Sequence, residues 1–222
     1  MATAATPATE AQLGERRFVV HGVDWDGYEA LLRIMPGVRI TYDRGVVELM
    51  SPQFPHELYR RRIGRLIEIV AEELEIAIVG AGSTTFKRRV LDRGLEPDEC
   101  FYLGGYDRLA SLATIDLDVD PPPDLAIEVD ISSSSLDKMG IYAALQIREV
   151  WRFDGESLTV AVLDEGGGYR PSSTSLAFPF LPIADIPPLI LDPAAGDDSR
   201  LGREYRAWVR DVVAPRRAGP GG

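Results

Sequence analysis

The stretch "PDLAIEVDISSSSLDK", residues 123–138, constrains the fold more than any other part of the chain. Its centre reads as a buried strand over 125–131, and a strand alternates its side chains between two faces. Burying unpaired carboxylates is costly, so the face that carries acids needs a compensating partner. One face would present Leu125, Ile127, Val129 and Ile131, and the other Asp124, Ala126, Glu128 and Asp130.

Patterns along the rest of the chain predict an α/β fold, in which a mixed sheet is flanked by helices. Apolar residues at helical spacing predict a long helix over 56–76. A β-hairpin is expected over 38–50, with its turn at Asp43-Arg44-Gly45. Further helices are expected over 24–36, 105–113, about 136–146 and 201–213. The serines would supply the N-cap of the helix at about 136–146. Further strands are expected around 83–89 and over 95–103, 149–154 and 157–171.

A length of 222 residues suits one domain, predicted over 17–213, with disordered tails over 1–16 and 214–222. No apolar run approaches the ~18 residues of a membrane span, and no signal-peptide core is seen, so a cytoplasmic protein is expected. Cys100 is the only cysteine, which excludes an internal disulfide. The net charge of −11 argues against nucleic-acid binding by bulk electrostatics, but not against an enzyme that approaches phosphates through a metal ion.

Two stretches place an acid soon after a proline, "EPDECFY" and "PPPDLAIEVD". In the first, Glu96, Asp98 and Cys100 would share one face of a strand. If that strand lies beside the 125–131 strand, Asp98 and Glu128 meet at one end of the sheet. Carboxylates without histidine suit Mg²⁺ or Mn²⁺, and coordination would compensate their buried charge.

Lysine usage is a separate signal, because only Lys87 and Lys138 are lysines among the 24 basic residues. A lysine that remains in an arginine-rich chain can mark a place that needs a compact ammonium with an adjustable pKa. For Lys138 this interpretation stands beside the alternative of a surface residue. For Lys87 the surface interpretation is favoured.

Four motifs, "VVELMSPQFPHE", "GLEPDECFYL", "PPDLAIEV" and "SSSSLDKMGIYAALQIREVWRFD", together resemble the Uma family of restriction-endonuclease-like proteins, within the PD-(D/E)xK nuclease superfamily. The resemblance covers about residues 24–192. It implies a restriction-endonuclease-like mixed sheet, with an added N-terminal hairpin and C-terminal strands, and a Mg²⁺-dependent phosphodiesterase site. The family's motif aspartate matches Asp98, its strand glutamate matches Glu128, and a lysine from the next helix matches Lys138.

The resemblance also departs from the superfamily pattern and adds further candidates. Asp130 stands where the superfamily has its lysine, so it either adds a third metal ligand or weakens the site. Glu48 and His56 match positions near the family's site. His56 is expected to be exposed at a helix start, where it would meet a phosphate or water.

Structural alternatives accompany these candidates. Asp98 could cap a turn after Pro97, and Glu128 could pair with an arginine. Asp124 is interpreted as a strand-start residue, and Tyr142 as core. Trp151 and Phe153 are expected in the core, and Arg60, Arg61 and Arg62 on a solvated helix face rather than on a phosphate backbone.

The leading hypothesis is a metal-dependent endonuclease that acts on DNA, working as a homodimer because cutting two strands favours paired sites. Asp98 and Glu128 would hold the metal ion, and Lys138 would position or deprotonate the attacking water. The alternatives are an inactive nuclease-fold module for binding or oligomerisation, and a phosphohydrolase of small nucleotides.

Overall fold

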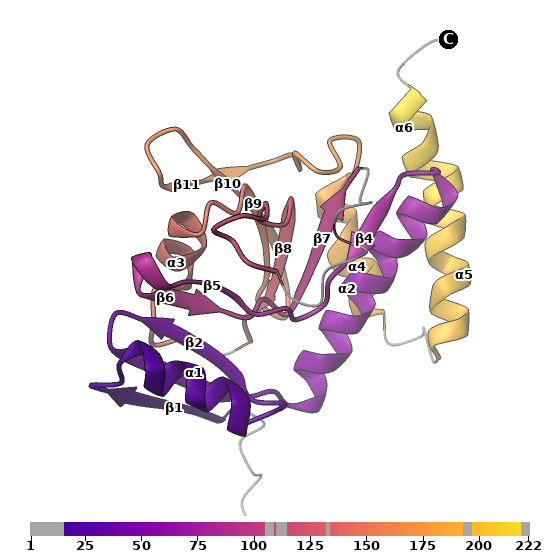
Figure 1. The fold of residues 1–222 in the computed structure, drawn as a ribbon. Helices are drawn as coiled ribbons and strands as arrows, with labels where there is room; N and C mark the ends of the chain where they lie inside the picture. Colours follow the sequence, from indigo (N-terminus) through magenta and orange to yellow (C-terminus); the bar gives the residue numbers. More distant parts are fainter. Residues whose placement is uncertain (1–15, 105–108, 110–114, 132–133, 193–196, 219–222) are drawn as a thin grey trace, which may run out of the picture.

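The computed structural model describes residues 16–104, 109, 115–131, 134–192 and 197–218, which form two β-sheets and the helices that cover them (Figure 1). One sheet has five strands in the order β1-β3-β2-β6-β5, and the other has six in the order β11-β10-β9-β8-β7-β4. The predicted α/β class with a mixed sheet is therefore confirmed. Over the described residues, no helix combines the length and apolar character that crossing a membrane requires.

The five-stranded sheet is built around the predicted hairpin. Strands β2 (Arg39–Asp43) and β3 (Val46–Ser51) pair antiparallel. Arg44 and Gly45 between them have φ of 45° and 89°, as a tight hairpin turn of this kind requires. Helix α1 (Trp25–Ile34) begins after the predicted cap Asp24, whose side chain accepts a hydrogen bond from the Gly27 N–H. Strand β1 (Arg16–His21), which the sequence did not predict, pairs with β3 and opens at a residue assigned to the tail.

The single strand predicted over 95–103 is wrong, because the chain passes there from one sheet to the other. Strand β6 (Arg93–Leu95) pairs with β2 and β5, whereas β7 (Glu99–Leu103) pairs with β8 and β4. Pro97 lies between them and lacks the N–H that a continuous ladder needs. The strand expected around 83–89 shortens to β5 (Phe86–Arg88), followed by a 3₁₀ turn over Arg89–Leu91, and β4 (Ile78–Gly80) was not predicted.

The six-stranded sheet is mixed because of one crossover. Strands β8 (Leu125–Val129) and β9 (Glu149–Phe153) run parallel, and helix α3 (Lys138–Ala144) connects them. Parallel neighbours need such a crossover, whereas antiparallel ones can be joined by tight turns. Strand β10 (Leu158–Leu163) follows β9 through a turn at Gly155 (φ 99°), and β11 (Tyr169–Ser172) pairs with β10.

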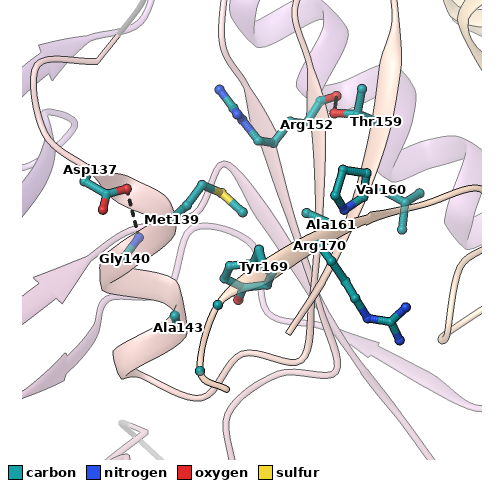
Figure 2. A pocket seen from close by; sticks show the side chains of 13 residues that line it. Asp137, Met139, Gly140, Ala143, Arg152, Thr159, Val160, Ala161, Tyr169 and Arg170 are labelled. Atoms are coloured by element: carbon teal, nitrogen blue, oxygen red, sulfur yellow. Dashed lines mark hydrogen bonds between the residues drawn. The ribbon is translucent and has the colours of Figure 1, made fainter. Parts of the chain in front are cut away.

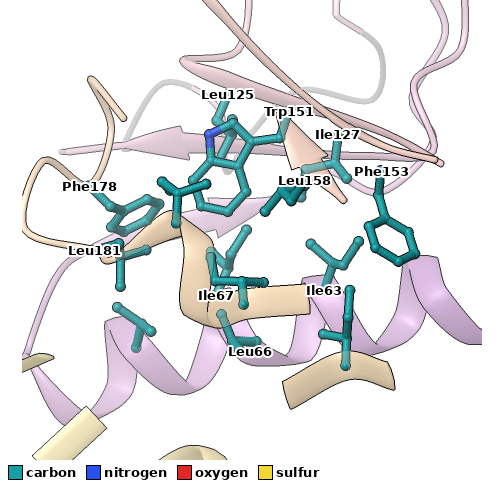
Figure 3. Packing of buried hydrophobic residues seen from close by; sticks show 14 of the residues in the cluster. Ile63, Leu66, Ile67, Leu125, Ile127, Trp151, Phe153, Leu158, Phe178 and Leu181 are labelled. Atoms are coloured by element: carbon teal, nitrogen blue, oxygen red, sulfur yellow. The ribbon is translucent and has the colours of Figure 1, made fainter. Parts of the chain in front are cut away.

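Each face of this sheet has its own core, and the predicted alternation is confirmed within β8. The strand is shorter than predicted, because it ends at Val129, and Ile131, expected on the same core face, is 38% exposed. Leu125, Ile127 and Val129 pack against helix α2 (Phe54–Glu73), together with Trp151 and Phe153 (Figure 3). Ala126 packs on the other face, with Ile141, Tyr142 and Leu145 at α3. Glu128, the one acid within β8, therefore faces α3.

The C-terminal helices cover the α2 side of the sheet. Helix α5 (Asp198–Trp208) contacts α2 and continues as a π-helical turn over Val209–Val213 and as α6 (Ala214–Ala218). Helical structure thus continues past 213, where a tail was predicted, and Arg217 donates to the Leu74 carbonyl at the end of α2. Before α5 come a 3₁₀ turn over Ile183–Asp185 and α4 (Ile186–Leu191). The helix expected over 105–113 lies largely outside the described residues.

Candidate active site

Glu128 is the centre of a buried polar cluster on the α3 face of β8. Its side chain is 3% exposed. The Lys138 Nζ donates to Glu128 Oε2 at 2.6 Å, and the Tyr142 hydroxyl donates to Oε1. Lys138 and Tyr142 are four residues apart and lie on one face of α3. Glu128 therefore pairs with the rare lysine, rather than with the arginine that the alternative interpretation expected.

Tyr142 is the partner that the sequence interpretation missed. It was assigned to the core and is indeed fully buried, but its hydroxyl holds a carboxylate oxygen. The i, i+4 spacing from Lys138 was the signal that could have found it. A buried tyrosine hydroxyl needs a hydrogen-bond partner, and here that partner is Glu128.

Asp98 reaches the same end of the sheet, at the start of β7. Its backbone N–H donates to the Ile127 carbonyl at 3.1 Å, next to the pairing of Glu99 with Ile127. Its side chain is 1% exposed, and Oδ2 accepts from the Val129 N–H at 2.7 Å. Asp98 thus sits beside β8 as predicted, and its carboxylate bridges two strands instead of capping its own turn.

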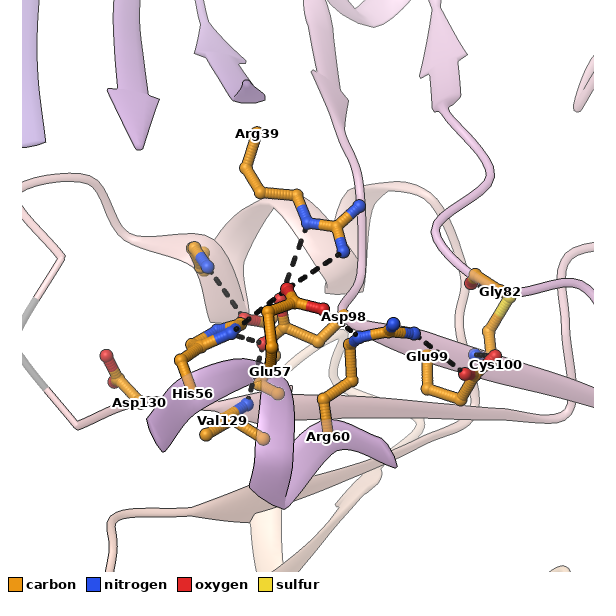
Figure 4. A network of polar contacts seen from close by, with 12 residues as sticks. Arg39, His56, Glu57, Arg60, Gly82, Asp98, Glu99, Cys100, Val129 and Asp130 are labelled. Atoms are coloured by element: carbon orange, nitrogen blue, oxygen red, sulfur yellow. Dashed lines mark hydrogen bonds and ion pairs between the residues drawn. The ribbon is translucent and has the colours of Figure 1, made fainter. Parts of the chain in front are cut away.

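His56 contradicts the expectation of an exposed residue. Its Nε2 lies 3.1 Å from Asp98 Oδ2, and the side chain is fully buried (Figure 4). Helix α2 begins at Phe54, two residues earlier than predicted, with Pro55 in its first turn. This start turns His56 toward the sheet, where it contacts Asp98 rather than solvent.

Burial and neighbouring charges shift the pKa values of Glu128 and Asp98 in opposite directions. Burial raises the pKa of Glu128, and the nearby Asp98 adds to this, although Lys138 opposes it. Burial would also raise the pKa of Asp98, but the hydrogen bond from His56 and the charge of Lys138 bring it below its ordinary value. Burial lowers the pKa of Lys138, yet the two carboxylates more than offset it and the pKa is raised. Lys138 is therefore an ammonium at neutral pH.

Glu48 and Asp130 belong to a second polar layer that is joined by Arg17 of β1. Arg17 Nη1 donates to Glu48 Oε1 at 2.8 Å, and Arg17 Nη2 lies 3.6 Å from Asp130 Oδ1. Asp130 also accepts from Arg152 Nη2 at 2.8 Å. The carboxylate that stands in the lysine's place is thus held by two guanidinium groups.

Glu48 also contacts the two serines that precede α3, Ser134 and Ser135. The Ser134 hydroxyl and the Ser135 N–H donate to its two oxygens at 2.8 and 2.7 Å. The expected serine N-cap of α3 is wrong, because Asp137 is the cap and accepts from the Gly140 N–H at 3.0 Å. A carboxylate on the five-stranded sheet therefore sets the position at which Lys138 begins its helix.

A cavity of about 200 Å³ opens onto this cluster. It gives access to the paired side chains Glu128 and Lys138, which are otherwise buried. The lining residues are Glu128, Asp130, Ser134, Leu136, Asp137, Lys138, Met139 and Arg152.

The carboxylate oxygens of Asp98 and Glu128 are suitable ligands for a hard divalent cation, but they are only two residues. Asp98 and Glu128 offer carboxylate oxygens only, which Mg²⁺ and Mn²⁺ prefer. Within the described ranges, no group of three or more His, Cys, Asp or Glu side chains is arranged to hold a metal ion. Mg²⁺ commonly binds through one or two carboxylates and keeps several waters, so this pair is compatible with it.

Other charged candidates have structural partners. Lys87 pairs with Glu29 at 2.8 Å, and the Asp124 carboxylate accepts from the Leu103 N–H at 2.7 Å. Arg60 and Arg61 pair with acids of this chain, and Arg62 Nη1 donates to the Ile190 carbonyl at 2.6 Å. The basic run of α2 is therefore occupied by contacts within the chain.

Comparison with known proteins assigns the family. The model of the Uma2 family, described as "Putative restriction endonuclease", matches residues 25–192. The chain belongs to the Uma2 family. That match agrees with the four motifs and with the extent of the resemblance seen in the sequence.

Two further comparisons add little to the Uma2 assignment. No curated protein matches this chain. A solved structure from Anabaena variabilis, titled a putative nuclease belonging to DUF820, is similar at 14% identity and a TM-score of 0.45. The similarity covers 77% of this chain and 90% of that one.

Proposed function

We propose that this Uma2 protein is an endonuclease that hydrolyses phosphodiester bonds of DNA with the help of Mg²⁺ or Mn²⁺. One observation carries the proposal: the Lys138 ammonium contacts Glu128 beside Asp98, at the wall of a cavity open to a substrate. Two buried carboxylates and a lysine on separate elements have little value for stability alone, since a buried ion pair is often no better than apolar packing.

Asp98 and Glu128 would hold the ion, which when bound lowers the pKa of a coordinated water and offsets charge on the phosphate. The chain's own contribution is to orient these two carboxylates. The Val129 N–H and His56 fix Asp98, and the Tyr142 hydroxyl fixes Glu128.

Lys138 would act first as a cation rather than as a base. Because its pKa is raised, it enters the reaction protonated, and its ammonium can orient water or stabilise negative charge on a phosphoryl oxygen. To accept a proton from water, it would first have to lose its contact with Glu128. The ion pair between the Lys138 ammonium and Glu128 thus favours the positioning role over deprotonation.

A plasmid-nicking assay with Mg²⁺ or Mn²⁺ tests this function. Glu128→Gln and Lys138→Ala should each lower the nicking rate by about 10²-fold or more, as expected for loss of a group that acts on the reacting charge. Lys87→Ala is the matched control, because it removes the other lysine, which pairs with Glu29 on the surface. Nicking by Glu128→Gln at the wild-type rate would refute the catalytic assignment.

A nuclease-fold binding module is the second candidate, and Asp130 favours it. Arg17 and Arg152 hold this residue where the superfamily has a lysine. Calorimetric titration with Mn²⁺ separates the two functions: the endonuclease requires binding that Asp98→Asn weakens, whereas a binding module requires none.

A further inference from the structure

A second, larger cavity lies next to the candidate active site, between α3 and strands β9, β10 and β11 (Figure 2). Its volume is about 580 Å³, within the range of pockets that bind small molecules. Met139 and Ala143 of α3 form one wall. Arg152, Thr159, Ala161 and Tyr169 line the wall made by the strands.

Strand register shows which side chains face this cavity. Arg152 pairs with Thr159, and Val150, two residues before Arg152, packs in the core beneath α3. Arg152 therefore points to the α3 side. Arg170, by contrast, lies opposite Val162, which packs in the core on the other face of the sheet. Figure 2 accordingly shows the Arg170 side chain directed away from α3.

The two cavities adjoin, because Asp137, Met139 and Arg152 line both of them. Arg152 is 45% exposed and donates from Nη2 to Asp130. A guanidinium has five N–H donors, so this contact leaves others to bind an anion. A group bound at Glu128 and Lys138 would thus meet a positive charge at the boundary with the larger cavity.

We propose that the larger cavity binds the nucleoside next to the scissile phosphate, with Arg152 contacting the phosphate between the two cavities. This inference rests on the proposed nuclease function. The walls suit a flat base: Met139, Ala143 and Ala161 are apolar, and Tyr169 offers an aromatic ring whose hydroxyl is held by the Ile147 carbonyl. A base within a duplex cannot enter a cavity between a helix and a sheet, so the preferred substrate is single-stranded or locally unpaired DNA.

Calorimetric titration of the metal-free protein in EDTA tests the base-binding role. The probes are dAMP and deoxyribose 5-phosphate, which share the sugar and the phosphate but carry adenine and a hydroxyl, respectively, at C1′. dAMP should bind about tenfold tighter or more, the effect expected from stacking one base. Ala161→Phe, which narrows the cavity between α3 and the sheet, should reduce this difference.

Two arginine variants test the phosphate contact. Arg152→Ala should weaken both ligands by a similar factor, and its half-exposed side chain makes it a mild change to the fold. Arg200→Ala is the matched control, because it removes an arginine of similar exposure (49%) on α5 that pairs with Glu204 and lines neither cavity, and it should bind both ligands as wild type does.

The possible outcomes separate this inference from the proposed function. Equal affinity for dAMP and deoxyribose 5-phosphate overturns the nucleoside site, whether or not DNA is cleaved. A preference for dAMP in a protein that does not nick DNA supports the site and refutes the endonuclease alone. In an active enzyme, a lower KM for single-stranded than for duplex DNA of one sequence supports the site, and the reverse order overturns it.

Discussion

At the scale of single residues, the site is a set of buried charges that compensate one another. Glu128 has both oxygens engaged by α3, and Asp98 is held by a backbone N–H and by His56. A buried charge is tolerated only when it is paired and hydrogen-bonded. These contacts make the cluster sensitive to the loss of any one member.

Asp98→Asn should make stability less dependent on pH. The pKa of Asp98 is lowered in the folded protein, so its contribution is present above the ordinary value of 3.8 and is lost as pH falls through the folded pKa. At pH 7 the variant should lose about 1–3 kcal/mol of unfolding free energy. Urea unfolding at pH 7, 5, 4 and 3 measures this. The difference in unfolding free energy between wild type and variant should shrink as the pH falls below about 4. A difference that stayed constant with pH would contradict a lowered pKa for Asp98.

At the scale of elements, α3 decides the geometry of the site. One helical turn places Lys138 and Tyr142 on Glu128, while Glu48 holds the preceding loop through Ser134 and Ser135. A seven-residue helix is too short to be stable by itself, so its start depends on its cap and on these contacts.

Asp137→Ala should destabilise the first turn of α3, where Lys138 lies. Loss of an N-cap side chain costs about 1 kcal/mol, and nicking should fall because the ammonium is less well positioned. Asp137→Asn keeps the cap while removing the charge, so it should retain most of both stability and activity. Thermal unfolding and the nicking rate of the two variants provide the comparison. If Asp137→Asn lost as much stability and activity as Asp137→Ala, the charge of Asp137 rather than its capping hydrogen bond would be responsible.

At the scale of the whole molecule, β1 is an edge strand with an apolar surface. Phe18, Val19 and Val20 are 64%, 37% and 42% exposed, and β1 ends the five-stranded sheet. An open apolar edge can pair with another strand. The homodimer expected from the superfamily therefore has a candidate interface at β1.

If the wild type is the dimer expected from the superfamily, Phe18→Lys should shift it to a monomer, because the charge disfavours pairing along this edge. Light scattering after size-exclusion chromatography measures the mass in solution. Phe54→Lys is the matched control, since Phe54 is 77% exposed at the start of α2 and lies outside β1. A Phe18→Lys protein that keeps a dimeric wild-type mass would exclude β1 as the interface, and a monomeric wild type would refute the expected homodimer itself.

The sequence by itself determined the patterns that depend on neighbouring residues. Alternation in β8, the helical spacing of α2 and the hairpin at Gly45 follow from local periodicity and turn chemistry, and the structure confirms them. The four motifs likewise indicated the family that the Uma2 match shows.

Only the tertiary structure decided which distant groups meet in "PDLAIEVDISSSSLDK" and around it. His56 is buried on Asp98, Tyr142 holds Glu128, and Glu48 reaches across from the other sheet to the serine loop. The split of 95–103 between two sheets is of the same kind. These contacts depend on how the sheets and helices pack, and local sequence periodicity carries no information about that.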